Sequence, residues 1–246
     1  MAGLDLIEWT PTGPYRVGFS TRRGGVSEGS FASLNLGIRT DDEPAHVIEN
    51  RTRLCAEAGV DPDGATMAWQ RHGATVRQAV PRGIVTPGTV YDHCDGLWSD
   101  AAGQGMLLLT ADCLPIALVR PPGGRQPAVA VLHAGWRGLL AGIVAAGAKA
   151  LGGGRLAAAI GPGIGPCCYQ VGAEVATPFR EAFGGDVVRD GRLDLWTSAE
   201  RALRAAGCES VERVDLCTSC HPDRFFSHRR DAGHTGRQGV IASVRG

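Results

Sequence analysis

The chain has 246 residues, 43% of them hydrophobic, and is long enough to bury a substantial core. Its 25 acidic and 25 basic residues balance, which argues against nucleic acid or an anionic membrane surface as a partner. The sequence has no signal-peptide pattern and no apolar run of bilayer length, so we expect a soluble, cytoplasmic protein. In that compartment the eight cysteines are expected to be thiols or metal ligands rather than disulfides.

Strand-like apolar runs alternate with turns and helical patterns along the chain. A strand followed by a Gly-Gly turn is predicted over 16–27, and a helix over 43–60, with Pro44 near its start and Gly59 after its end. A strand-like run over 65–80 is interrupted at His72. Further strands are predicted over 105–119, 127–135 and from 155, helices over 138–151, 173–183 and 193–207, and two last strands around 217–238. This mixture, without a break in composition, predicts one α/β or α+β domain over 1–246.

Two of these runs carry unusual residues for a core. LTADCLPIAL places Asp112 and Cys113 inside an apolar run, and AVAVLHAGWRG closes the next run on His133. If the two runs form a hairpin, Cys113 and His133 come together, and His72 at the break of a third strand is a further candidate. Two histidines and one cysteine form a zinc ligand set that leaves one position open, as in catalytic sites. Copper suits the same ligands, so they do not determine the metal.

Each of these residues also has an ordinary structural interpretation. A cysteine in an apolar strand is usually a small core residue, and a histidine at a strand end is commonly hydrogen-bonded. In a regular strand Asp112 points away from Cys113, where it orients a neighbouring group or caps a loop.

Longer motifs carry a family resemblance: FSTRRGGVSEGSFASLNLG, QRHGATV, TADCLPIAL, LHAGWRG, IGPGIGPCCYQVG and CTSCHPDRFFSHRRDAGHTGRQ. Through them the chain resembles the laccase-domain family, whose members are also called polyphenol oxidase-like proteins, peptidoglycan editing factors and purine nucleoside phosphorylases. The resemblance spans about residues 17–244. It implies a compact α/β domain with layered mixed sheets flanked by helices, and zinc bound by His72, Cys113 and His133. One departure from the family pattern, CDGLWSD, leaves the role of Asp95 open.

The resemblance also implies an activity on small molecules. It implies phosphorolysis of adenosine, inosine, guanosine or methylthioadenosine, and hydrolytic deamination of adenosine. For deamination, zinc on the three ligands would lower the pKa of a bound water whose hydroxide attacks C6, with Asp112 shuttling the proton. Asp112, Cys113 and His133 are therefore the expected catalytic residues. Phosphate needs guanidinium partners, for which Arg137, before an expected helix, and Arg230 are the candidates.

Two other enzyme classes fit parts of the pattern. A metal-free hydrolase with Cys113 as nucleophile and His133 as base would suit peptidoglycan precursors and would survive chelation. Copper-dependent oxidation of polyphenols ranks last, because multicopper chemistry needs many histidines and this chain has seven.

The CTSC motif offers a separate pair of thiols, Cys217 and Cys220. Because no second C-x-x-C accompanies it, we expect this pair to be structural and dispensable for metal binding. The adjacent Cys167 and Cys168 point to different sides of an extended chain and are expected to be packing residues.

Overall fold

Two β-sheets packed face to face form the centre of the computed structural model, which describes residues 4–123 and 125–246. The first sheet has the antiparallel order β1-β2-β12-β5, and the second has the mixed order β11-β8-β6-β7-β4-β3. The first consists of β1 (Leu6–Trp9), β2 (Tyr15–Ser20), β12 (Gln238–Val244) and β5 (Met106–Thr110). The second consists of β11 (Cys208–Arg213), β8 (Leu156–Ile160), β6 (Leu114–Val119), β7 (Val129–Ala134), β4 (Gly96–Ser99) and β3 (Val76–Gln78).

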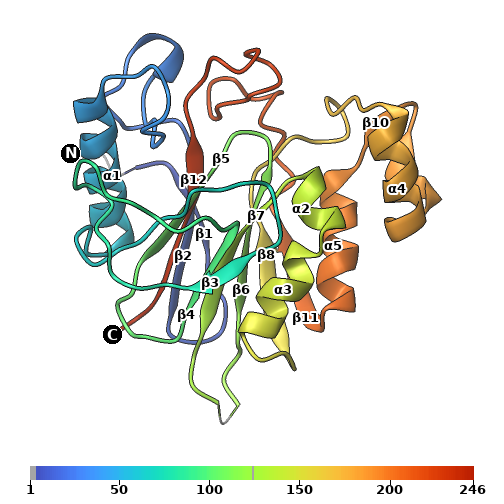
Figure 1. Cartoon of the computed structure of the whole chain (residues 1–246), viewed down its shortest axis with the longest axis horizontal. Helices are drawn as coiled ribbons and strands as arrows, with labels where there is room; N and C mark the ends of the chain where they lie inside the picture. Colours follow the sequence, from blue (N-terminus) through green and yellow to red (C-terminus); the bar gives the residue numbers. More distant parts are fainter. Residues whose placement is uncertain (1–3, 124) are drawn as a thin grey trace.

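Helices cover the two outer faces, so the molecule has four layers (Figure 1). One helix, α1 (Pro44–Ala58), lies beside the first sheet (Figure 1). The helices α2 (Trp136–Leu140), α3 (Ile143–Ala150) and α5 (Leu195–Ala205) lie against the second sheet, and α4 (Ala173–Phe183) lies farther out, next to α2 and α5. A small pair of strands, β9 (Val188–Arg189) and β10 (Arg192–Leu193), adjoins α4 and α5.

Three hydrophobic clusters hold these layers together. The cluster between the sheets joins Phe19 and Val240 of the first sheet to Val119 and Val131 of the second. The opposite face of the second sheet packs on α3 and α5, and α4 joins the same cluster next to α2 and α5. The opposite face of the first sheet packs on α1. Because residues on both faces of β6 and β7 are fully buried, these strands read as continuous apolar runs rather than alternating ones.

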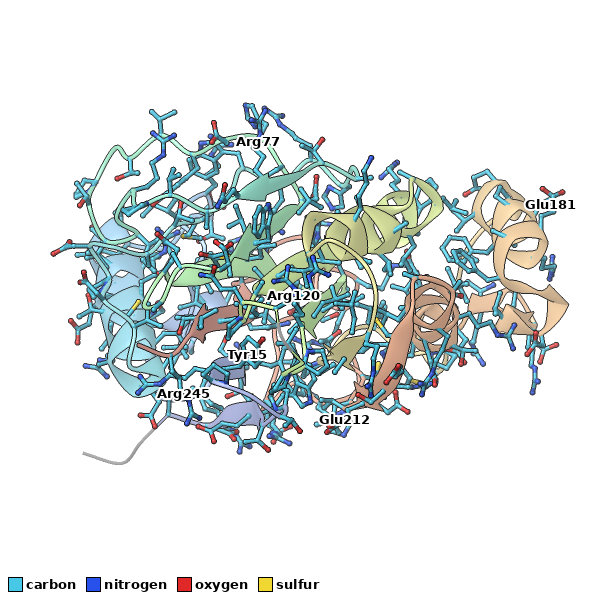
Figure 2. All side chains as sticks on the ribbon, turned by 90° about the horizontal axis from the view of Figure 1, so that it is seen from below. Tyr15, Arg77, Arg120, Glu181, Glu212 and Arg245 are labelled. Atoms are coloured by element: carbon cyan, nitrogen blue, oxygen red, sulfur yellow. The ribbon has the colours of Figure 1, made fainter. Side chains whose placement is uncertain are left out.

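Polar contacts also join the two sheets. The Tyr15 hydroxyl at the start of β2 donates to the Arg120 carbonyl and accepts from the Ala128 amide at 3.2 Å. Figure 2 shows Tyr15 and Arg120 near the middle of the molecule, with Glu181 of α4 at one extremity. At the edge, the Trp9 indole donates to the Glu212 carboxylate of β11 at 3.0 Å.

Most of the predicted elements are confirmed. The helix that begins at Pro44 ends where Gly59 adopts φ 61°, a left-handed conformation that suits glycine. The predicted helix over 138–151 is instead two helices, because Gly142 with φ 85° interrupts it. In the run over 65–80, the regular strand is only β3.

The sequence predicts a single strand through LTADCLPIAL, and this prediction is wrong because the segment forms parts of two strands. β5 ends at Thr110 and β6 begins at Leu114, and the two strands belong to different sheets. Asp112 and Cys113 therefore lie in the link where the chain crosses from one sheet to the other. The confirmed fold is a mixed α/β domain with helices flanking layered sheets. In the described part of the chain, no helix combines the length and apolar character needed to span a membrane.

Candidate metal centre and substrate cleft

His72, Cys113 and His133 come together at one end of the central strands. Antiparallel pairing of β6 with β7 sets Pro115 opposite His133 and Leu114 opposite Ala134. Cys113, the residue just before β6, is thereby brought beside the end of β7, where His133 lies. His72 approaches from the turn before β3, and its ring meets that of His133 edge-on with centroids 4.8 Å apart. One ligand atom from each of the three residues lies within 4.8 Å of the other two. The hairpin expected from the sequence thus brings the candidate ligands together.

Asp95 holds both histidines of the site, His133 by its ring and His72 by its backbone amide. Its Oδ1 lies 2.9 Å from His133 Nδ1, and its carboxylate also accepts the backbone amides of His72 and Gly73, both at 2.8 Å. Burial opposes ionisation of Asp95, but these hydrogen bonds outweigh it and lower its pKa. Because Nδ1 of His133 is engaged by the carboxylate, Nε2 is the ring nitrogen that is left to bind a metal. A histidine that binds a metal commonly donates a hydrogen bond from its other ring nitrogen to a carboxylate, which fixes the orientation of the ring.

Cys113 and His133 favour each other's charged forms, the thiolate and the imidazolium. Burial raises the pKa of the Cys113 thiol, but the charge and hydrogen bonds of His133 and His72 outweigh burial and lower it to about 6. Burial likewise disfavours the imidazolium of His133, yet Cys113 and Asp95 raise its pKa to about 9. A thiolate is the form of cysteine that binds metals and attacks electrophiles.

Backbone conformation at the site is unusual. His72 has φ 59° and Asp112 has φ 88°, in a region that residues with a Cβ seldom adopt. Such conformations are retained where surrounding contacts impose them, and functional sites are a common place for them. Gly135 permits a close approach, because a Cβ there would lie 2.7 Å from Cys113 Sγ.

Asp112 is buried and both its carboxylate oxygens are engaged. Oδ1 accepts from the Thr218 hydroxyl at 2.6 Å and Oδ2 accepts from the Arg229 amide at 2.7 Å, while its carbonyl accepts from the Ile164 amide at 2.8 Å. The expectation that Asp112 sits in a regular strand is wrong, because the chain bends here. Asp112 therefore anchors two loops while it also lines the cleft.

The centre lies at the wall of a cleft of about 580 Å³, a volume typical of small-molecule sites. His72 is exposed to this cleft, Cys113 is half-buried and His133 is buried, so the centre is open on one side. Three guanidinium groups in the cleft lie over aromatic rings: Arg39 over Trp69, Arg137 over Trp136 and Arg229 over Tyr169. The cleft thus combines an open metal-type centre with cations and flat apolar surfaces.

The two arginines predicted to hold phosphate have different positions. Arg137 lines the cleft, although it lies inside α2 rather than before a helix. Arg230 is not among the lining residues, because its guanidinium binds Asp231 and the carbonyls of Thr218 and Phe225. Arg230 thus lies outside the lining of the cleft, and its neighbour Arg229 reaches the cleft instead. Nothing in the local pattern SHRRD distinguishes the two arginines.

The donor set fits a zinc ion. Two imidazoles and a thiolate are soft or borderline ligands, and an exposed side of the centre leaves room for a fourth ligand. Sequence reasoning did not identify Asp95 as the orienting group, nor Arg39 with Trp69 as part of the cleft. The signal for Asp95 was its place directly before an apolar segment that forms β4, whose first residue, Gly96, pairs with Leu132 next to His133.

These features define a mixed α/β protein with a His-Cys-His centre at the wall of a small-molecule cleft. Residues 16–245 match the family model described as multi-copper polyphenol oxidoreductase laccase, and the chain belongs to this family. It is 37% identical to a purine nucleoside phosphorylase of Pseudomonas aeruginosa over 94% of this chain and 93% of that protein.

Solved structures are similar over the same extent. The crystal structure of YlmD from Geobacillus stearothermophilus aligns with a TM-score of 0.86 and 33% identity, covering 97% of this chain and 94% of that one. The hypothetical protein YfiH of Bacillus licheniformis aligns with a TM-score of 0.87 and 32% identity, covering 94% of this chain and 93% of that one. The family resemblance and the layered fold are thereby confirmed.

Proposed function

We propose that this protein is a zinc-dependent purine nucleoside phosphorylase that also deaminates adenosine. The observation that carries the proposal is the open His72-Cys113-His133 centre in a cleft lined by arginines and aromatic rings. Relatives about 35% identical to the chain are named purine nucleoside phosphorylases, which supports the same substrate class here. The substrates would be adenosine, inosine, guanosine or methylthioadenosine, together with inorganic phosphate.

His72, Cys113 and His133 would hold the zinc, with Asp95 fixing the tautomer of His133. A bound zinc ion supplies Lewis acidity and lowers the pKa of a coordinated water. Trp69, Trp136 and Tyr169 line the cleft and offer flat surfaces for a purine base.

Arg137 is the proposed phosphate partner, with the adjacent cations Arg39 and Arg229 lining the same cleft. A guanidinium matches phosphate oxygens through paired hydrogen bonds. Asp112 is the proposed carrier of the proton in deamination. Its oxygens accept hydrogen bonds from Thr218 and Arg229 but each retains a lone pair for a further partner. Asp112 would thus act from a position that those two bonds hold in place.

A second candidate function has one specific observation in its favour. Asp95, His133 and Cys113 are linked in series, as in a cysteine hydrolase with a nucleophile, a base and an orienting carboxylate. Such an enzyme would act on amide bonds of peptidoglycan precursors. We rank it below the phosphorylase because it leaves His72, the third converging ligand, without a role.

Copper-dependent polyphenol oxidation is the remaining candidate. The family description supports it by name, and copper suits the same three ligands. Within residues 4–123 and 125–246, however, the groupings with metal-ligand spacing contain two histidines in total, His72 and His133. Coupled oxidation at several copper ions calls for many more imidazoles. We therefore do not favour this activity.

The deciding experiment follows products with and without phosphate. With adenosine and phosphate we expect free adenine and ribose 1-phosphate, and without phosphate we expect inosine. A strong chelator should abolish both reactions, and added Zn²⁺ should restore them. A chelated protein that cleaves amide substrates and leaves nucleosides untouched would establish the hydrolase instead.

A further inference from the structure

Four cysteines outside the cleft meet at the junction of two loops. Cys167 and Cys168 lie in the loop between β8 and α4, and Cys217 and Cys220 lie in the loop after β11. Cys220 Sγ is 3.4 Å from Cys167 Sγ and 3.4 Å from Cys168 Sγ. All four sulfur atoms lie within 4.8 Å of one another. The expectation that the C-x-x-C pair has no partner is therefore wrong, because adjacent cysteines some fifty residues earlier supply the partners.

From this geometry we propose that Cys167, Cys168, Cys217 and Cys220 form a second metal site that binds a structural Zn²⁺ ion. Tetrahedral zinc with Zn–S bonds of about 2.3 Å sets its sulfur ligands about 3.8 Å apart. Two of the sulfur–sulfur distances are 3.4 Å and none of the others exceeds 4.8 Å, so the observed distances lie on both sides of that value or close to it. Four thiolates close the coordination sphere, which is the pattern of structural rather than catalytic zinc.

The arrangement favours a metal over a disulfide. Cys220 contacts both Cys167 and Cys168 equally, but a disulfide would use only one of them and leave the other unpaired. A metal engages all four thiols at once. The Gly165 amide donates to Cys217 Sγ at 3.3 Å, a contact that stabilises sulfur as a thiolate. Cys167 and Cys220 are exposed, which gives a metal ion a route into the group.

The backbone holds the two loops in register for this site. The Gly163 amide donates to the Leu216 carbonyl at 3.3 Å, and the Thr218 amide donates to the Gly163 carbonyl at 3.1 Å. The same loops reach the cleft, because Ile164 and Thr218 both bind Asp112. A metal that links the two loops would therefore stabilise the wall of the cleft that contains Asp112. The inference stands on the cysteine geometry and is independent of the proposed function.

The test counts zinc in intact protein purified with zinc in the medium. We expect about two zinc ions per chain by elemental analysis. The paired change Cys217→Ser with Cys220→Ser should remove one equivalent, and so should Cys167→Ser with Cys168→Ser on the other loop. As a matched control, Cys55→Ala with Cys208→Ala, two buried thiols outside the group, should keep both equivalents.

A second measurement covers the case in which a double variant does not fold. In His72→Ala, which disrupts only the first centre, the remaining zinc should show four sulfur neighbours at about 2.3 Å by X-ray absorption. A mixed nitrogen and sulfur shell would overturn the proposal. So would unchanged zinc content in both double variants, or wild-type protein in which these thiols are oxidised to a disulfide and carry no metal.

Discussion

Asp95 lies between the two histidines of the candidate metal centre, hydrogen-bonded to the ring of His133 and to the backbone amide of His72. One carboxylate thus positions two ligands that are sixty-one residues apart in the chain. This relationship makes Asp95 the first residue to change in testing the centre.

Replacing Asp95 by Asn keeps the shape of the side chain but removes its charge. We expect zinc affinity to fall about tenfold to hundredfold, because the amide no longer favours the required tautomer of His133. Competition with a chromophoric chelator measures this affinity. Asp92→Asn, on the exposed side of the same segment, is the matched control and should bind zinc like the wild type. Equal affinities in the two variants would show that Asp95 has no role at the centre.

Gly135→Ala should disturb the centre through crowding alone. The added Cβ would lie 2.7 Å from Cys113 Sγ, so the thiolate must move away from the histidines. We expect a loss of zinc affinity and of turnover of at least tenfold, the equivalent of about 1.4 kcal/mol. Gly185→Ala, where no atom lies within 4 Å of the new Cβ, should leave both unchanged. Full zinc content and activity in Gly135→Ala would show that the ligands do not need this close approach.

Arg137→Ala should separate the two proposed reactions. Only phosphorolysis uses phosphate as a substrate, so we expect the KM for phosphate to rise about tenfold to hundredfold. The rate of adenosine deamination should stay near the wild-type value. Steady-state assays of both products on one preparation measure the split. Arg155→Ala, on the opposite end of the second sheet and largely exposed, serves as the control. An equal loss of both activities would assign Arg137 to the nucleoside or to folding.

Arg230→Ala should act on stability instead of phosphate binding. Its guanidinium joins Asp231 to the carbonyls of Thr218 and Phe225, and losing these bonds should cost about 2 kcal/mol of the free energy of unfolding. Urea denaturation measures this loss, and KM for phosphate should stay near the wild-type value. A raised KM with unchanged stability would restore Arg230 as a substrate contact.

Zinc affinity of the first centre should depend on pH in a defined direction. Because Cys113 has its pKa lowered to about 6 and His133 has its pKa raised to about 9, zinc must displace the His133 proton between these values. Affinity should therefore rise about tenfold per pH unit from pH 6 to pH 9. Below pH 6 it should fall more steeply, because the thiol proton must also leave.

Calorimetry in buffers of different ionisation enthalpy counts the protons that zinc binding releases. The measurement uses the double variant Cys217→Ser with Cys220→Ser, in which only the first centre remains. Zinc binding that releases no proton at pH 7.5 would contradict the charged pair.

The amino-acid sequence by itself determined the local helices and strands and the pairing of strands that are neighbours in the chain. Pro44 and Gly59 mark the ends of α1 because one lacks an amide hydrogen and the other adopts a left-handed backbone at little cost. Two apolar runs joined by a short turn pair as β6 and β7, which was enough to bring Cys113 to His133. His72, at the break of a third strand-like run, was a further candidate, and the family motifs implied the same three ligands.

Only the tertiary structure decided which distant segments share a surface. The break between β5 and β6, the place of Asp95 behind His133, and the turn of Arg230 away from the cleft all depend on how two sheets pack. The meeting of Cys167 and Cys168 with Cys217 and Cys220 depends on parallel pairing of β8 with β11 across an intervening pair of helices. Local periodicity and capping are encoded within a few residues, whereas contacts between loops arise from the packing of strands that lie far apart in the chain.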